Sequence, residues 1–328
     1  MSQSKLDAAR VKLQSRAFSP DNIPTEKEIL LTIRQSTIGT PQSFVVFSGI
    51  PKSGKSTFMS ALIASAFTPY DIFAMKLKRP ENCPKIGLFD TESTDFDFYK
   101  YLCRIRDFAH LENIPHDLNA FCFREDEPEQ IKLMINAYLH DNPDCKIIII
   151  DGLLDLLIDF NDVRECKMLI NWIKAITKKY GVLVISVLHT SKTSGNTLGH
   201  LGSMADRLVQ SSMKIERNKE ANTFDLSPAF LRSSADFEPV QIMNTTGTWQ
   251  MVEHEIKENK SEFNLYQAQL LVNKVVPSQG IQYKDLLADI QETQAIGVNA
   301  AKKIIKKLIE WNLITKNSKN LYQQKRAV

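Results

Sequence analysis

The sequence predicts an α/β fold in which a mostly parallel sheet is flanked by helices, followed by a second, smaller domain. From Phe44 onward, short apolar runs alternate with longer amphipathic stretches, which is the pattern of successive β-strand and α-helix units. One run contains four consecutive isoleucines and another is nearly all apolar, as expected of strands that helices cover on both faces. Around residues 253–261 the chain turns polar, which indicates a domain boundary.

Residues 1–42 are polar and are expected to lead onto the core, with a helix over residues 6–17 and an extended stretch over residues 28–33. The α/β domain is predicted to span residues 43–253. Its parallel strands are expected at residues 44–48, 85–90, 118–123, 146–151 and 182–188. Later extended segments, expected to add to one sheet edge in antiparallel fashion, lie at residues 212–216, 223–230, 240–243 and 248–252.

The C-terminal domain is predicted to span residues 262–328. Its pattern indicates three helices followed by a short hairpin, which together make a winged helix, a variant of the helix-turn-helix. The helices are expected at residues 262–275, 283–293 and 298–311, and the hairpin strands at residues 313–316 and 321–324. In the third helix we expect Ile304, Ile305, Leu308 and Ile309 to pack inward and Lys302, Lys303, Lys306 and Lys307 to face mostly outward.

The composition narrows the class of protein. A chain of 328 residues with 43% hydrophobic content can bury one large core and a second, small one. No stretch approaches the ~20 uninterrupted apolar residues of a membrane span, and the polar N-terminus has no secretory signal. The five cysteines are odd in number and form no C-x-x-C pair, which argues against a zinc site or a disulfide framework. We therefore expect a cytoplasmic protein with reduced thiols and no membrane partner.

Charge is unevenly distributed along the chain. The net charge is only +3, but residues 261–328 contain ten Lys/Arg and five Asp/Glu, and from residue 299 onward eight Lys/Arg accompany a single acidic residue. A basic terminal domain on a near-neutral body suggests a polyanion partner such as DNA. A solvated basic helix, or a domain that contacts proteins or caps a ring, would have the same composition. Lysine-rich recognition surfaces favour contact with the nucleic-acid backbone over the reading of bases.

A phosphate-binding loop is the most informative motif in the chain. Residues 49–56 fit the template Gly-x4-Gly-Lys-Ser/Thr, with an apolar run before them and a helical stretch after them. A strand, a glycine turn and a helix N-terminus present backbone N–H groups and a positive dipole end to phosphate oxygens, which predicts ATP binding. Lys55 is expected to neutralise the β/γ charge, and the hydroxyl of Ser56 to ligate Mg²⁺. The expected nucleotide-binding residues are Gly49, Ser53, Gly54, Lys55, Ser56 and Thr57.

Carboxylates follow two of the predicted strands. Asp151 ends the isoleucine strand, where its side chain would point into the ligand crevice and hold Mg²⁺ directly or through a water; alternatively, it caps the next helix. Glu92 is expected to orient the attacking water, with Asp90 in reserve; its alternative role is that of a helix N-terminal acid. Asp155 and Asp159 are expected to face solvent.

A third strand end has a polar residue, His189, which is expected to sense the γ-phosphate, although an isolated histidine is often only a surface residue. Its neighbours favour the sensor role. Residues 190–203 form a long stretch rich in Gly, Ser and Thr, and loops of this length in a compact domain are usually functional or disordered.

Together these residues resemble the RecA superfamily of ATPases, and within it the hexameric replicative helicases of the RepA and DnaB kind, including relatives on plasmids and mobilisable elements. The resemblance implies a RecA-type core, ATP hydrolysis with Glu92 as the catalytic glutamate, and nucleotide sites between adjacent subunits of a ring. The matching pieces are the phosphate loop and residues 89–92, 147–151, 187–192, 199–203 and 205–206.

The resemblance also implies an arginine finger that the next subunit contributes from the strand after the Gly-Ser segment. Arg217 is preferred because its planar fork matches phosphate oxygens, but a surface arginine is the alternative, and Lys214, Lys219 and Arg232 are further candidates. Two departures from the family pattern concern the loop and the N-terminus. Pro51 removes one loop amide, and about forty residues before the core are too few for a primase domain, so the resemblance supports ATPase chemistry more than a full replicative helicase.

The leading hypothesis is an ATP-hydrolysing nucleic-acid motor or remodeller of a mobile element. It is a P-loop ATPase with ATP and Mg²⁺ as cofactors, DNA as partner and a homo-oligomeric, hexameric ring as assembly. The second hypothesis is an ATP-regulated DNA-binding protein without motor activity, such as a replication or transposition regulator. The third is a small-molecule kinase, a class that has a basic lid and a substrate pocket and needs no winged domain.

Overall fold

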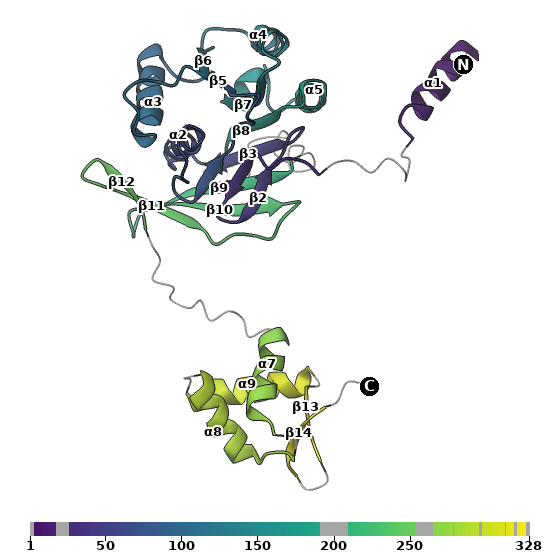
Figure 1. The fold of residues 1–328 in the computed structure, drawn as a ribbon, viewed down its shortest axis with the longest axis vertical. Helices are drawn as coiled ribbons and strands as arrows, with labels where there is room; N and C mark the ends of the chain where they lie inside the picture. Colours follow the sequence, from purple (N-terminus) through teal and green to yellow (C-terminus); the bar gives the residue numbers. More distant parts are fainter. Residues whose placement is uncertain are drawn as a thin grey trace. The chain divides into compact units, whose positions relative to one another are not determined.

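The computed structural model describes residues 3–17, 26–190, 209–252, 265–277, 279–294, 297–311, 313–317 and 320–325 (Figure 1). The chain divides into two compact units, Met1–Glu253 and His254–Val328. Along the described ranges, no helix combines the length and the apolar composition that crossing a bilayer requires.

A nine-stranded sheet forms the centre of the first unit, in the order β12-β11-β10-β9-β3-β8-β7-β5-β6. The strands expected from the five apolar runs are all present, and they pair in parallel with one another. The α/β class with a mostly parallel sheet is therefore confirmed. The bounds of these strands are β3 Phe44–Gly49, β5 Lys85–Asp90, β6 Leu118–Cys122, β7 Cys145–Asp151 and β8 Leu183–His189.

Helices cover both faces of this sheet: α2 Lys55–Ser65, α3 Asp95–Phe108, α4 Pro128–Asp141 and α5 Val163–Tyr180, with a short 3-10 helix η1 at Leu153–Leu156 (Figure 1). Side chains alternate between the two faces of a strand, so β7 supplies two separate hydrophobic cores. Ile147 and Ile149 belong to the core that includes α2 and α3. Ile148 and Ile150 belong to the core that includes α4 and α5. This double burial explains why the strand is apolar at four consecutive positions.

A small antiparallel sheet, in the order β2-β1-β4, packs into the core that includes α2. Its strands are β1 Leu31–Ile33, β2 Ser36–Gly39 and β4 Met75–Leu77. Leu31 and Ile38 are fully buried, so the extended stretch before the phosphate loop is part of the core of the first unit. The preceding helix, α1 Gln3–Gln14, has no buried residue.

The far edge of the large sheet consists of β9 Ser211–Asn218, β10 Thr223–Leu231, β11 Val240–Thr245 and β12 Thr248–Met251. The last three strands add in antiparallel fashion, as expected. The expectation is wrong for β9, which pairs in parallel with β3 and antiparallel only with β10. Because β8 ends at His189 and β9 begins at Ser211, the connection is long enough for a parallel return.

The second unit contains three helices followed by a two-stranded antiparallel hairpin. Side chains from all three helices and from both hairpin strands form a separate hydrophobic core. The elements are α7 Leu265–Val275, α8 Tyr283–Gln294, α9 Val298–Glu310, β13 Ile314–Lys316 and β14 Tyr322–Gln324.

The buried face of α9 matches the expected one except at Ile309. Ala301, Ile305 and Leu308 are buried, at the spacing that places side chains on one face of a helix. Ile309, which we expected to pack inward, is 46% exposed, because it lies one residue beyond that face. The lysines at 302, 303 and 306 are exposed, as expected, whereas Lys307 is half-buried and has its ammonium group over the ring of Trp311.

Candidate functional site

The register of the parallel strands brings the predicted site residues to one edge of the sheet. Gly49 lies opposite His189 in the β3–β8 pair, and Asp90 lies opposite Asp151 in the β5–β7 pair. In open α/β sheets, ligands bind outside the carboxyl ends of the strands, and all four of these residues are at such ends. The phosphate loop, the carboxylates and the histidine are therefore neighbours.

The phosphate loop depends on two glycines for different reasons. Gly54 is the N-cap of α2 and has φ +96°, a left-handed conformation that glycine adopts without strain. A Cβ at this position would also stand 2.7 Å from Cδ1 of Phe224 on β10. At Gly49 the limit is space, because a Cβ would stand 2.3 Å from the carbonyl oxygen of Ile215 on β9. The loop thus turns at Gly54 and touches β9 at Gly49.

The polar residues of the loop differ in burial. Ser53, Lys55 and Thr57 are buried, whereas Ser56 is exposed at the start of α2. Within the described part of the chain, the buried Oγ of Ser53 has no hydrogen-bond partner. Burying a hydroxyl without a partner is costly, so this atom fits a site in which a ligand oxygen completes its bonding.

Lys55 has its ammonium group in the middle of the site. Its Nζ donates to the carbonyl oxygens of Gly49 at 3.1 Å and Ile50 at 3.0 Å, and it lies 3.2 Å from Nδ1 of His189. Burial lowers the pKa of Lys55, and the negative charges of Glu92 and Asp151 oppose this shift.

The other nitrogen of the same imidazole contacts Glu92, the predicted catalytic carboxylate. Nε2 of His189 lies 3.0 Å from Oε1 and 3.2 Å from Oε2 of Glu92. An ammonium group can only donate, so Nδ1 accepts from Lys55 and Nε2 bears the proton that is donated to Glu92. This hydrogen bond lowers the pKa of Glu92; burial opposes the shift, and the charge of Lys55 adds to it.

Asp90, the reserve candidate for orienting water, has a different task. Its carboxylate accepts hydrogen bonds from the backbone N–H of Glu92 at 3.1 Å, from the N–H of Ser93 at 2.7 Å and from Oγ of Ser93 at 2.8 Å. Burial raises the pKa of Asp90, and the bonds from Ser93 oppose the shift. Asp90 therefore holds the turn after β5. Glu92 itself precedes the N-cap of α3, which is Thr94.

Asp151 ends β7 next to the loop. Burial first, and then the negative charges of Asp90 and Glu92, raise the pKa of Asp151 to about 7. A bound cation would reverse the effect of this repulsion. Asp151 does not cap a following helix, because the N-cap of η1 is Gly152 and that of α5 is Asp162. A carboxylate at this strand end, whose charge interacts with that of Lys55, suits a cation ligand.

Thr91 joins the ends of β5 and β7, a role that the sequence did not reveal. Its N–H donates to the Asp151 carbonyl at 3.0 Å, and its hydroxyl lies 2.7 Å from Oδ2 of Asp155. Gly152 makes this possible, because a Cβ there would stand 2.1 Å from Oγ1 of Thr91. Asp155 and Asp159 are exposed, as expected, but the Asp155 carboxylate is held by Thr91. In the sequence, the glycine directly after Asp151 was the one sign that another residue approaches the backbone closely at this strand end.

The residues at this edge fit a nucleoside triphosphate with Mg²⁺. The N–H groups at the start of an α-helix suit phosphate oxygens, and α2 begins at Lys55, two residues after Ser53, whose buried hydroxyl has no partner among the described residues. Ser56 and Asp151 would offer two oxygens to the cation, which commonly completes its shell with phosphate oxygens and water.

Arg217 is exposed on β9, and its guanidinium carbon lies 5.2 Å from the ring centroid of Phe224. This is the ring that Gly54 faces, so Arg217 is close to the phosphate loop of its own chain. Among the other candidates for the finger, Lys214 pairs with Glu216 at 2.8 Å, and Arg232 lies over Phe230. Arg217 thus approaches the loop through Phe224, and Lys214 lies opposite Ser48, the residue before the loop, in the β3–β9 pair.

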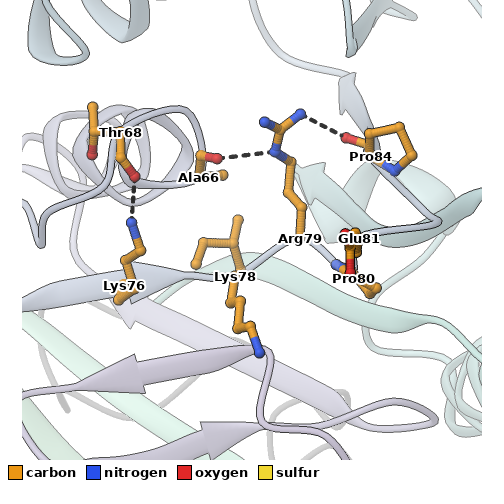
Figure 2. Close-up of a pocket in the computed structure, with 9 residues that line it drawn as sticks. Ala66, Thr68, Lys76, Lys78, Arg79, Pro80, Glu81 and Pro84 are labelled. Carbon is orange, nitrogen blue, oxygen red and sulfur yellow. Dashed lines mark hydrogen bonds between the residues drawn. The ribbon is translucent and has the colours of Figure 1, made fainter.

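A cavity elsewhere in the first unit is lined by basic residues that hydrogen-bond to carbonyl oxygens near the end of a helix. It adjoins the C-terminal end of α2, and Figure 2 shows Lys76 and Arg79 directed toward that end. Lys76 donates to the carbonyl oxygen of Thr68 at 2.5 Å, and Arg79 donates to those of Ala66 at 2.9 Å and Pro84 at 3.0 Å (Figure 2). Cations at a helix C-terminus satisfy its last carbonyls and its dipole, so these charges have a structural role.

A substitution at Gly54 tests the loop geometry. Gly54→Ala is expected to lower the free energy of unfolding by about 1–3 kcal/mol more than Gly247→Ala, because both glycines have positive φ but only the Cβ at Gly54 meets another side chain. Urea denaturation of both variants measures the difference. Phe224→Leu in the Gly54→Ala background should recover part of the loss, and equal losses at the two glycines would contradict the contact with Phe224.

The Gly/Ser/Thr-rich stretch after His189 is described only at Thr190, which is buried and donates its N–H to the Gly49 carbonyl at 3.2 Å. The rest of the expected loop lies outside the described residues.

No protein-family model matches the chain, and a search of curated proteins finds no significant match. The case for a function therefore rests on the residues at this edge of the sheet.

Proposed function

We propose that the chain is an ATP-hydrolysing nucleic-acid motor or remodeller with a RecA-like core and that it acts on DNA. One observation carries the proposal. Lys55, His189 and Glu92 form a hydrogen-bonded line from the start of α2, past the end of β8, to the turn after β5. The line joins a group suited to hold a phosphate to a group suited to orient water.

Each residue has its own task in this function. The N–H groups at the start of α2 and the Lys55 ammonium bind the phosphates and orient them. Ser56 and Asp151 would hold Mg²⁺, which neutralises phosphate charge when it is bound. Glu92 accepts a hydrogen bond from a water molecule and aims it at the terminal phosphorus.

The proposed assembly is a homo-oligomeric ring, hexameric as in the enzymes that the chain resembles. Arg217 is exposed on β9 and carries a planar fork that matches phosphate oxygens. In the ring, it would complete the nucleotide site of the adjacent subunit. Its contact with Phe224 supports this role, because a stacked guanidinium loses less freedom when it binds an anion.

The second unit is proposed to be a winged-helix domain that binds the DNA backbone. Exposed lysines on α9 support this function, and Lys316 on β13 adds a further charge over Tyr322. Changing Lys302, Lys303 and Lys306 together to glutamine is expected to weaken DNA binding and to reduce the slope of log K against log salt by about 2–3, since each phosphate contact contributes roughly 0.7–0.9. Fluorescence anisotropy at several salt concentrations measures the slope. An unchanged slope would contradict binding by this face.

ATP turnover with and without single-stranded DNA tests the proposed function. A motor is expected to hydrolyse ATP faster in the presence of DNA, because translocation couples the two ligands. The alternative, an ATP-regulated DNA-binding protein, is favoured by the separate basic unit, and it predicts ATP-dependent DNA binding without stimulated turnover. Turnover that DNA leaves unchanged would favour this alternative, and no turnover at all would contradict the ATPase.

A further inference from the structure

The three donors of the Lys55 ammonium group are all engaged, which limits how this residue can bind anything else. An ammonium group has three N–H donors, and Nζ contacts three acceptors: the carbonyl oxygens of Gly49 and Ile50, and Nδ1 of His189. A phosphate oxygen that binds Lys55 must therefore replace at least one of these acceptors.

Loss of Lys55 would affect the three acceptors unequally. The Gly49 carbonyl also accepts from the N–H of Thr190, and the Ile50 carbonyl also accepts from the N–H of Ser53. Both carbonyls keep a donor when Lys55 moves. Nδ1 of His189 makes no other hydrogen bond within the described residues. The imidazole is thus the partner that registers a movement of the ammonium group.

The same imidazole holds Glu92 by its other nitrogen. Nε2 lies within hydrogen-bond distance of both carboxylate oxygens, 3.0 and 3.2 Å away. A carboxylate has about four lone-pair sites, so the bond from His189 does not exclude water from Glu92; it fixes the direction in which the carboxylate points. The side chains of His189 and Glu92 are 26% and 44% exposed, so water already reaches Glu92, and what a turn of the imidazole changes is the orientation of the carboxylate.

We propose that His189 is a positioning residue that couples phosphate binding at Lys55 to the release of Glu92. A phosphate draws the ammonium group from Nδ1, the ring then loses the contact that fixes its orientation, and Nε2–H is free to leave Glu92 for a phosphate oxygen. The carboxylate is held while Lys55 is bonded to His189 and is free to turn when Lys55 is bonded to phosphate. This inference rests on the proposed ATPase function and adds a regulatory step to it.

Nitrogen NMR of the histidine-labelled full chain tests the line of contacts without requiring activity. The chain has six histidines, and the spectrum of His189→Gln identifies the signals of His189. We expect the tautomer protonated at Nε2 in the absence of nucleotide. Lys55→Met should shift the Nδ1 signal and Glu92→Gln the Nε2 signal, whereas Lys167→Met, an exposed lysine on α5, should change neither. A His189 spectrum that neither site variant alters would overturn the proposal.

A non-hydrolysable ATP analogue with Mg²⁺ supplies the second arm of the experiment. Calorimetry establishes that the analogue binds, and its binding should shift both nitrogen signals of His189 in the wild-type chain. Binding that leaves them unchanged would overturn the coupling even if the ATPase function is correct. Conversely, no ATP turnover in the wild-type chain would contradict the ATPase function, while the NMR contacts could still be present. The two failures are therefore distinguishable.

The kinetics of two His189 variants separate the effect of its two hydrogen bonds from the effect of its side-chain volume. Glutamine can accept with its amide oxygen and donate with its amide nitrogen, so His189→Gln keeps both bonds, whereas His189→Leu removes both at similar size. Leucine lacks the N–H that would pass from Glu92 to a phosphate oxygen, so we expect this variant to lose kcat on the order of 10²-fold with a much smaller change in KM, and the glutamine variant to recover most of that loss. Equal kcat values for the two variants would show that the bonds do not matter.

Discussion

Lys55→Ala is expected to lower ATP turnover by at least ~10²-fold, because it removes the buried cation that would neutralise phosphate charge as the terminal group leaves. The ammonium group lies between the loop carbonyls and His189, so alanine also breaks the contact that links the loop to Glu92. Phosphate release at saturating ATP and Mg²⁺ measures the loss.

The matched control is Lys167→Ala, which removes the same charge from an exposed position on α5 and should leave turnover unchanged. Thermal unfolding should establish that both variants are folded. If the folded Lys55→Ala chain hydrolyses ATP at the wild-type rate, the phosphate loop does not have the role assigned to it.

Glu92→Gln is expected to reduce kcat by about 10²–10⁴-fold while ATP affinity stays nearly unchanged. Glutamine keeps the size of the side chain and an oxygen that can accept from His189, but it lacks the charge that orients and polarises water. The pKa of Glu92 is lowered first by the hydrogen bond from His189, so the wild-type residue is ionised at neutral pH. Single-turnover hydrolysis and calorimetric titration of ATP measure the two quantities separately.

Asp90→Asn provides the comparison for this prediction. Three hydrogen bonds end on the Asp90 carboxylate, and an amide cannot accept all of them without presenting N–H to another donor. We therefore expect Asp90→Asn to lower the free energy of unfolding by about 1–3 kcal/mol. If Asp90→Asn abolished hydrolysis in a fully stable chain while Glu92→Gln remained active, the roles of the two carboxylates would be reversed.

The fold class and the approximate place of the site could be predicted from the sequence because both depend on local patterns. Apolar runs marked the strands, and the carboxyl ends of parallel strands meet at one edge of a sheet. Residues far apart in the chain were therefore expected to be neighbours, as Glu92 and His189 are at a separation of 97. The glycines of the phosphate loop were recognisable because φ +96° at Gly54 excludes ordinary side chains at that point.

Features that depend on pairing across the sheet were not predictable in the same way. An extended segment does not specify its partner, so the parallel pairing of β9 with β3 could not be read from residues 211–218. The contact of Phe224 with Gly54 follows from that pairing. Nor does spacing tell a carboxylate that accepts three local hydrogen bonds, as Asp90 does, from one that is available to water, as Glu92 would be.

Strand β7 belongs to both hydrophobic cores, with Ile147 and Ile149 on one face and Ile148 and Ile150 on the other, and it ends at Asp151. A slip of one residue would exchange the two faces and carry that carboxylate about 3.3 Å along the strand. We therefore expect repacking of these cores to change the affinity of the proposed Mg²⁺ site. Variants that replace these isoleucines with smaller residues are expected to lose metal affinity and thermal stability together, because both depend on the position of β7.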